Sequence, residues 1–174
     1  AVAGGYAADL SRTFPLGERF DTAQRQIYEL VLQARAAALA SLHPGSTLVA
    51  AEDAARQAFA AGLEELGVGG GEGALVERLF PHRIGHWIGL EAHDGGPYLD
   101  AAGQARPLRA GMVLTIEPGL YFRRLASVSM PAAYQGVAVR VEDTVVICDE
   151  EPGFRVLGEG IAPRDAADIE ALRS

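Results

Sequence analysis

Residues 82–94 read His-Arg-Ile-Gly-His-Trp-Ile-Gly-Leu-Glu-Ala-His-Asp and hold three of the four histidines of the 174-residue chain. Imidazole is the commonest metal ligand in proteins and exchanges protons near neutral pH. Gly85 and Gly89 punctuate the stretch, and glycine allows a backbone to approach its neighbours closely. The stretch therefore predicts a functional site around which the chain packs tightly.

The composition is that of one globular domain, with 49% hydrophobic and 22% charged residues. A formal net charge of −8 argues against nucleic acid or an anionic membrane as a partner. Cys148 is the only cysteine, so a metal would have to be held mainly by histidine and carboxylate. No apolar run approaches the roughly 20 residues of a membrane span, and no signal peptide opens the chain. We therefore expect a cytoplasmic protein.

The first half of the chain predicts a hairpin and two helices. Gly4-Gly5 is a hairpin-turn signal followed by a strand-like run over 6–14, but only three residues precede the turn, so we expect a chain cut from something longer. Apolar residues at helical spacing predict a helix from about 22 to 42 and a second from about 48 to 66. The glycine run 69–71 predicts a loop and lacks the context of a phosphate-binding loop.

The second half predicts strands over 112–117 and 136–148, followed by a short helix over 163–172. The order of a strand, two helices, several strands and a final helix indicates an α+β fold. In such a fold the helices pack on one face of a sheet.

Three acids stand in or at the end of these apolar strands, namely Asp9, Glu117 and Glu142. Successive side chains of a strand point to opposite faces, so Arg140 and Glu142 share the face opposite the neighbouring valines. A charge in such a strand is costly unless it is paired or bound to a cation. A single acid nevertheless faces solvent more often than not, so spacing alone leaves both a metal site and a solvated polar face open.

Four ordered segments, 6–15, 82–94, 114–121 and 139–143, together resemble the catalytic domain of the pita-bread metallopeptidases, and most closely its Xaa-Pro aminopeptidase and prolidase branch. The resemblance implies one catalytic domain over residues 1–174, with a curved antiparallel sheet covered by helices on its outer face. The family's N-terminal domain and the first strand of the hairpin have no counterpart in the chain.

The resemblance also implies a metal site. Members of the family hold two divalent ions with two Asp, one His and two Glu, and the matching positions are Asp9, His86, Glu117 and Glu142. By this resemblance Asp9 and Glu142 bridge both ions. The family's first Asp would lie just upstream of Ala1, so one metal position is incomplete in this chain. Mn²⁺ is the expected ion, with Co²⁺ or Zn²⁺ as alternatives.

The same resemblance assigns roles in catalysis. It implies that Glu117 is the general base and that His82 and His93 face the substrate, with His93 steadying the tetrahedral intermediate. Tyr121 and Arg140 resemble residues that orient the bridging carboxylates. The implied reaction is hydrolysis of the N-terminal bond of peptides with proline in second position, by a hydroxide shared between the metals. A homodimer or higher homo-oligomer is expected for the full-length protein.

Other activities stay open on the sequence alone. They are a Xaa-Pro dipeptidase, a methionine aminopeptidase, a metal-free creatinase-like hydrolase, and an inactive fragment or binding module on the same fold. The context of residues 84–89 and of His93-Asp94 resembles the proline-specific branch. The four retained ligands favour an enzyme over the metal-free and non-catalytic alternatives.

Overall fold

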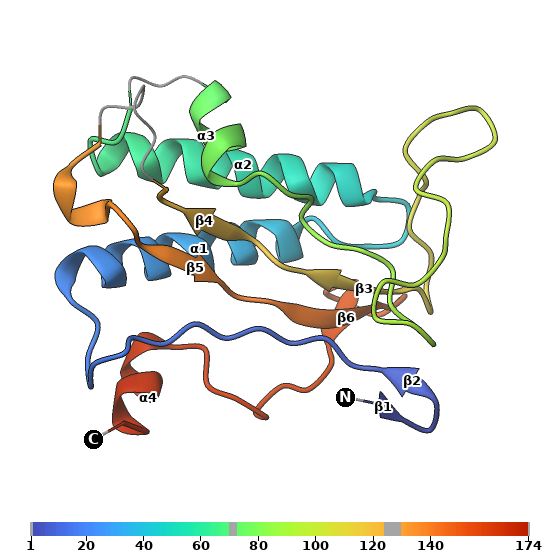
Figure 1. Cartoon of the computed structure of the whole chain (residues 1–174). Helices are drawn as coiled ribbons and strands as arrows, with labels where there is room; N and C mark the ends of the chain where they lie inside the picture. The colour runs from blue at the N-terminus through green and yellow to red at the C-terminus, as the bar shows by residue number, and fades with distance from the viewer. Residues whose placement is uncertain (1, 70–72, 124–129, 174) are drawn as a thin grey trace.

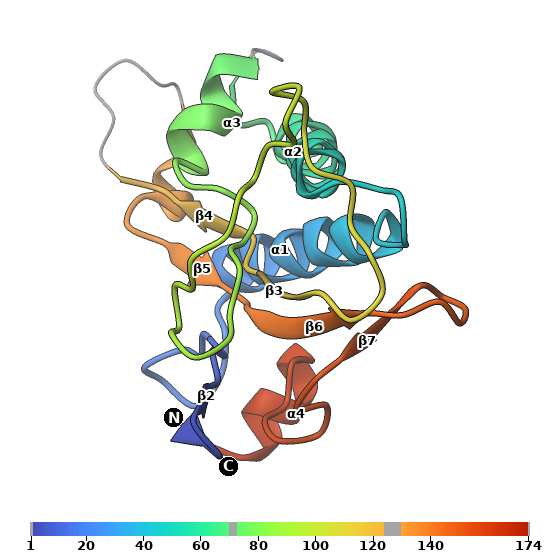
Figure 2. The same ribbon diagram turned by 90° about the vertical axis from the view of Figure 1, so that its right-hand side faces the viewer.

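A computed structural model describes residues 2–69, 73–123 and 130–173. Helix α1 (Thr22–Ala40) packs on the strands, and helix α2 (Leu48–Glu65) packs on α1. Figures 1 and 2 show α2, α1 and the strands as successive layers, with the short helix α4 (Ala166–Ala171) beyond the strands on the side away from α2. Within these described ranges, no helix is both long and apolar enough to cross a membrane.

The two predicted helices are confirmed, and their ends have local causes. At the start of α1, Asp21 and Gln24 form a reciprocal capping box, with the Asp21 carboxylate accepting from the Gln24 amide at 2.8 Å. At the start of α2, the Thr47 hydroxyl accepts from the Ala50 amide at 3.1 Å. The buried face of α2 carries Phe59 and Leu63, and that of α1 carries Ile27 among others.

Helix α3 (Gly73–Leu79) is not predicted by the sequence. It has only seven residues, too few to display a helical repeat, and it contributes Leu75, Val76 and Leu79 to the core. Most of the predicted glycine loop before it lies outside the described residues.

The predicted hairpin turn is confirmed, but the expectation that its first strand has no counterpart is wrong, because residues 2–3 form a short first strand. Strands β1 (Val2–Ala3) and β2 (Tyr6–Ala7) pair antiparallel across Gly4 and Gly5, whose φ angles are 60° and 88°. Two positive φ angles are what a type I′ turn requires. The predicted strand over 6–14 ends at Ala7, and beyond it only Ser11 pairs, as an isolated bridge to Glu142.

The remaining strands form two antiparallel units. Strands β3 (Val113–Ile116), β6 (Asp143–Ile147) and β7 (Phe154–Val156) form one sheet in the order β3-β6-β7. Strands β4 (Gly119–Tyr121) and β5 (Ala138–Arg140) form the other, and a 3₁₀ turn (Ala132–Tyr134) precedes β5.

The strand structure predicted over 136–148 is confirmed, but it consists of two strands, because the chain changes sheets within this run. Exposed and buried residues alternate as far as Val141, but Val141, Glu142 and Asp143 are all buried. The interruption of the alternation marks the passage from β5 to β6. It places Glu142 between the two sheets.

Gly85 confirms the expected close packing around the histidine stretch. A Cβ atom at this position would overlap the backbone carbonyl of Thr115 in β3. The absence of a side chain therefore lets residues 84–88 run directly beside β3.

We expect Gly85→Ala to lower the free energy of unfolding by about 1–3 kcal/mol, since the backbone of β3 has to move to admit the methyl group. Gly95→Ala is the matched control, because a Cβ there meets nothing within 4 Å. Urea denaturation of both variants measures the difference. Equal stabilities would contradict the close contact with Thr115.

Candidate metal centre

The histidine stretch reaches the site by running beside the outer edge of β3. The Thr115 amide donates to the His86 carbonyl at 2.9 Å, and the Glu117 amide donates to the Ile84 carbonyl at 2.7 Å. The His86 amide donates to the Thr115 hydroxyl at 3.1 Å. These bonds place His86 and Glu117 side by side at the end of β3.

Three carboxylates surround Nε2 of His86. The nearest oxygen of Asp9 lies 3.6 Å from this nitrogen, that of Glu117 3.7 Å and that of Glu142 3.9 Å. These separations exceed hydrogen-bond length. They are close to the roughly 3–3.5 Å expected between two ligand atoms that share one ion. The geometry thus fits a divalent cation held among the four side chains.

The other ring nitrogen of His86 is already committed. Nδ1 lies 3.0 Å from the Trp87 carbonyl oxygen, so it carries the proton and donates. In the neutral ring, Nε2 then carries the lone pair and faces the acids, as a metal-binding histidine requires.

Burial and mutual repulsion disfavour the charged forms of two of the acids. Burial, followed by the charge of Glu142, raises the pKa of Glu117 from 4.5 to about 7. Burial also raises the pKa of Glu142, although the Ser11 hydroxyl, which donates to this carboxylate at 2.6 Å, opposes the shift. A bound cation would remove this repulsion and favour both charged forms.

His93 lies at the mouth of the site. It is exposed, and its ring centroid lies 4.3 Å from that of His86. Ligand atoms of Asp9, His86 and His93 lie within 4.8 Å of one another, as do those of His86, Glu117 and Glu142. His93 is therefore placed to contact either a metal or a molecule bound to it.

His82, Tyr121 and Arg140 form the neighbouring wall. Nδ1 of His82 donates to the Arg83 carbonyl at 2.8 Å, so Nε2, 3.0 Å from the Tyr121 oxygen, accepts from that hydroxyl. Burial lowers the pKa of His82, which favours this neutral form. A guanidinium nitrogen of Arg140 lies 3.8 Å from Glu117. All the predicted site residues thus gather in one region.

The sequence missed three groups that hold this region together. The Ser11 hydroxyl donates to the Glu142 carboxylate, and the Thr115 hydroxyl accepts from the His86 amide. Arg12 donates to the Glu142 carbonyl at 2.8 Å. Thr115 could have been noticed because it shares a strand face with Glu117. For Ser11 and Arg12, proximity to Asp9 was the only signal.

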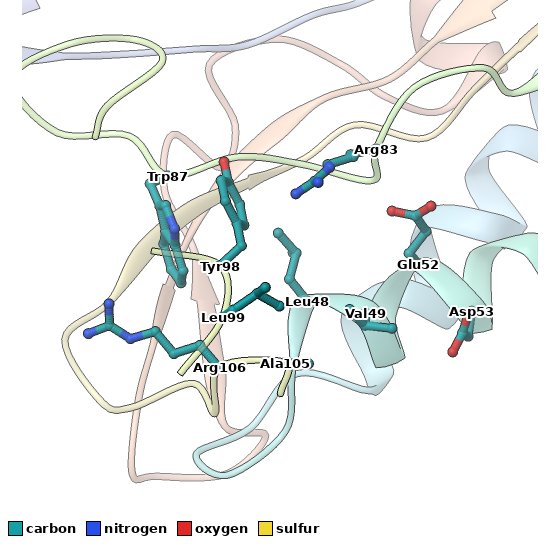
Figure 3. A pocket seen from close by; sticks show the side chains of 10 residues that line it. All are labelled: Leu48, Val49, Glu52, Asp53, Arg83, Trp87, Tyr98, Leu99, Ala105 and Arg106. Carbon is teal, nitrogen blue, oxygen red and sulfur yellow. The ribbon is translucent and has the colours of Figure 1, made fainter. Parts of the chain in front are cut away.

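The opposite side of the histidine stretch forms a separate groove of about 330 Å³. Arg83 and Trp87 alternate along the chain with the site histidines and line this groove together with Tyr98, on which Trp87 stacks at 5.7 Å between ring centroids (Figure 3). The stretch therefore presents His86 to the acids on one side and Arg83 and Trp87 to the groove on the other.

An imidazole among three carboxylates, framed by antiparallel strands and covered by helices, is the arrangement of the pita-bread fold with a candidate metal site. The chain belongs to metallopeptidase family M24, whose family model matches residues 1–149.

Its relatives include a "Xaa-Pro aminopeptidase" of Haemophilus influenzae, 39% identical over 96% of this chain and 39% of the relative. Among solved structures, the Pseudomonas aeruginosa aminopeptidase PepP matches with a TM-score of 0.89 and 38% identity, over 97% of this chain and 38% of that one. A zinc-substituted aminopeptidase P of Escherichia coli in complex with product matches with a TM-score of 0.85 and 35% identity, over 97% of this chain and 38% of that one. The chain thus spans about two fifths of the length of the curated relatives it matches.

We expect Glu117→Gln to remove a pH-dependent loss of stability from the metal-free protein. A folded pKa of about 7 against an ordinary 4.5 means that folded Glu117 binds its proton more tightly than unfolded Glu117 does. Stability therefore falls as pH rises from 4.5 through 7, and the neutral glutamine avoids this loss. The variant should exceed the wild type at pH 8 by about 3 kcal/mol, with a much smaller gain at pH 4.5.

Urea titrations with a chelator at both pH values measure this gain. Glu65→Gln makes the same chemical change at an exposed position of α2 and should alter stability by less than about 0.5 kcal/mol. A Glu117→Gln gain independent of pH would contradict the raised pKa.

Proposed function

We propose that this chain carries the metal-binding catalytic unit of an exopeptidase that releases the first residue from peptides with proline in second position. The observation that carries the proposal is the approach of three acid oxygens to Nε2 of His86, at 3.6–3.9 Å. The names of the relatives support the proline specificity, since the Haemophilus influenzae relative is a Xaa-Pro aminopeptidase.

Asp9, His86, Glu117 and Glu142 would hold the divalent metal. Oxygen ligands outnumber nitrogen in this set and no thiolate contributes, which suits Mn²⁺ or Co²⁺, with Zn²⁺ as a further candidate. A divalent metal bound there would lower the pKa of water and stabilise negative charge on a carbonyl oxygen. Tyr121 and Arg140 would limit the movement of His82 and Glu117.

Glu117 is the proposed general base. Its carboxylate lies 3.7 Å from Nε2 of His86, beside the proposed metal position, where it could take a proton from a water bound there. His93, exposed beside His86, can donate a hydrogen bond to a substrate carbonyl oxygen as negative charge develops on it. His82 is proposed to face the substrate next to Tyr121. A cytoplasmic location and self-association stay predictions.

We expect this chain to bind one Mn²⁺ per molecule, because the fifth ligand of the resemblance is absent from its sequence. An N-terminal extension Asp-Ala-Gly placed before Ala1 supplies a further carboxylate on the β1 arm and should raise the stoichiometry to two. The matched extension Asn-Ala-Gly should leave it at one. Calorimetric titration with Mn²⁺ measures all three, and two tight sites without the extension would contradict the expectation.

The Asp-extended chain with Mn²⁺ should release free Arg from Arg-Pro-Pro, and Glu117→Gln should lower kcat at least about 100-fold because the base is lost. Glu65→Gln should stay within about twofold of the parent. Chromatography of the products measures the rate. Equal cleavage of Arg-Ala-Ala would contradict proline specificity, and cleavage restricted to the dipeptide Arg-Pro would favour a dipeptidase. Near-normal turnover by Glu117→Gln would remove Glu117 from the role of base.

A further inference from the structure

The segment that carries Asp9 has no regular structure of its own. Strand β2 ends at Ala7 and α1 begins at Thr22, and between them the chain runs along β6 and β5 without forming a helix or strand (Figure 1). Asp9 nevertheless lies within 3.6 Å of His86. Its position must therefore be fixed by individual contacts.

Most of the contacts from residues 9–12 go to the turn around Glu142. The Thr144 hydroxyl donates to the Asp9 carbonyl at 2.8 Å. Ser11 and Glu142 exchange backbone hydrogen bonds of 3.0 Å and 3.3 Å, and the Ser11 hydroxyl donates to the Glu142 carboxylate. The segment is thus attached to the same turn that supplies the buried acid of the site.

Arg12 spans this junction with one guanidinium group. Its NH1 donates to the Ser11 carbonyl at 2.9 Å and to the Glu142 carbonyl at 2.8 Å, and its NH2 donates to the Asp143 carboxylate at 2.7 Å. A planar guanidinium fixes the relative positions of all three acceptors, which a single ammonium point charge cannot do.

Asp143 is the anchor for this group. Its side chain is 1% exposed, and it also accepts from Arg35 of α1 at 2.6 Å and from Arg164 at 3.4 Å. Asp143 pairs in register with Ile116, the residue before Glu117. The anchor is therefore next to Glu142 in sequence and lies opposite the residue before Glu117, and it touches neither carboxylate in the contacts described.

We propose that Arg12, anchored on Asp143, is a positioning residue that fixes the spacing between Asp9 and Glu142 and thereby sets the affinity of the site for a divalent cation. The proposal rests on the proposed function for the identity of the cation. Arg35 provides an internal comparison, because it pairs with the same carboxylate from α1 and has no contact with the Asp9 segment among those described.

The test compares Arg12→Lys with Arg35→Lys in the Asp-extended chain. Both keep the positive charge beside Asp143, but only Arg12→Lys breaks the fork that joins Ser11, Glu142 and Asp143. We expect Arg12→Lys to weaken Mn²⁺ binding about tenfold or more, as loss of an outer-sphere partner does, and Arg35→Lys to stay within about twofold. In the metal-free protein, the amides of Ser11 and Glu142 should exchange with deuterium faster in Arg12→Lys than in Arg35→Lys.

Three results would overturn the proposal or its basis. Unchanged Mn²⁺ affinity and exchange in Arg12→Lys, or equal losses in both variants, would reduce the cluster to a general stabilising feature. If the wild type failed to bind Mn²⁺, the proposed function would fall, while the exchange comparison would still decide the role of Arg12. If Arg12→Lys did not fold by circular dichroism, Asp143→Asn, which keeps an acceptor oxygen for Arg12, would be compared with Arg35→Lys by the same two measurements.

Discussion

Three carboxylates, from Asp9, Glu117 and Glu142, converge within 3.9 Å of one imidazole nitrogen. This concentration of negative charge determines the pKa values of the acids around it. Burial and repulsion raise the pKa of Glu117 and of Glu142 when no cation is present. Asp143, the residue after Glu142, lies instead among arginines. Burial alone would raise its pKa, but the hydrogen bond from Arg12 and the charges of Arg35 and Arg12 outweigh it and lower the pKa. Two acids adjacent in sequence thus have opposite electrostatic environments.

Local sequence patterns were sufficient for the long elements of the fold. The capped helices and the Gly4-Gly5 turn follow from their own residues. The passage from β5 to β6 could not be predicted in this way, because it is set by pairing with Ser11 and with β3, far away in the sequence. Helix α3 and strand β7 are too short to show a repeat, and their burial depends on tertiary contacts.

The site residues, like the elements of the fold, include some that local sequence patterns predict and some that only the tertiary structure reveals. Its acids and histidines were predicted from motifs that match a known family, and the structure brings them together. The groups that hold them, such as Ser11 and Arg12, form side-chain hydrogen bonds with partners 130 or 131 residues further along the chain. No local sequence pattern encodes such pairs. An acid such as Asp143 inside an apolar strand does signal a buried partner, but the identity of that partner comes only from the fold.

The hydrogen bond between Nδ1 of His86 and the Trp87 carbonyl has a further thermodynamic consequence. It selects one tautomer of the imidazole and one orientation of the ring while the chain folds. The rotational entropy of this side chain is therefore already lost before any cation arrives, and cation affinity is not reduced by it. A change in the path of the backbone at Trp87 would consequently disturb the centre even though the indole points into the groove on the other side.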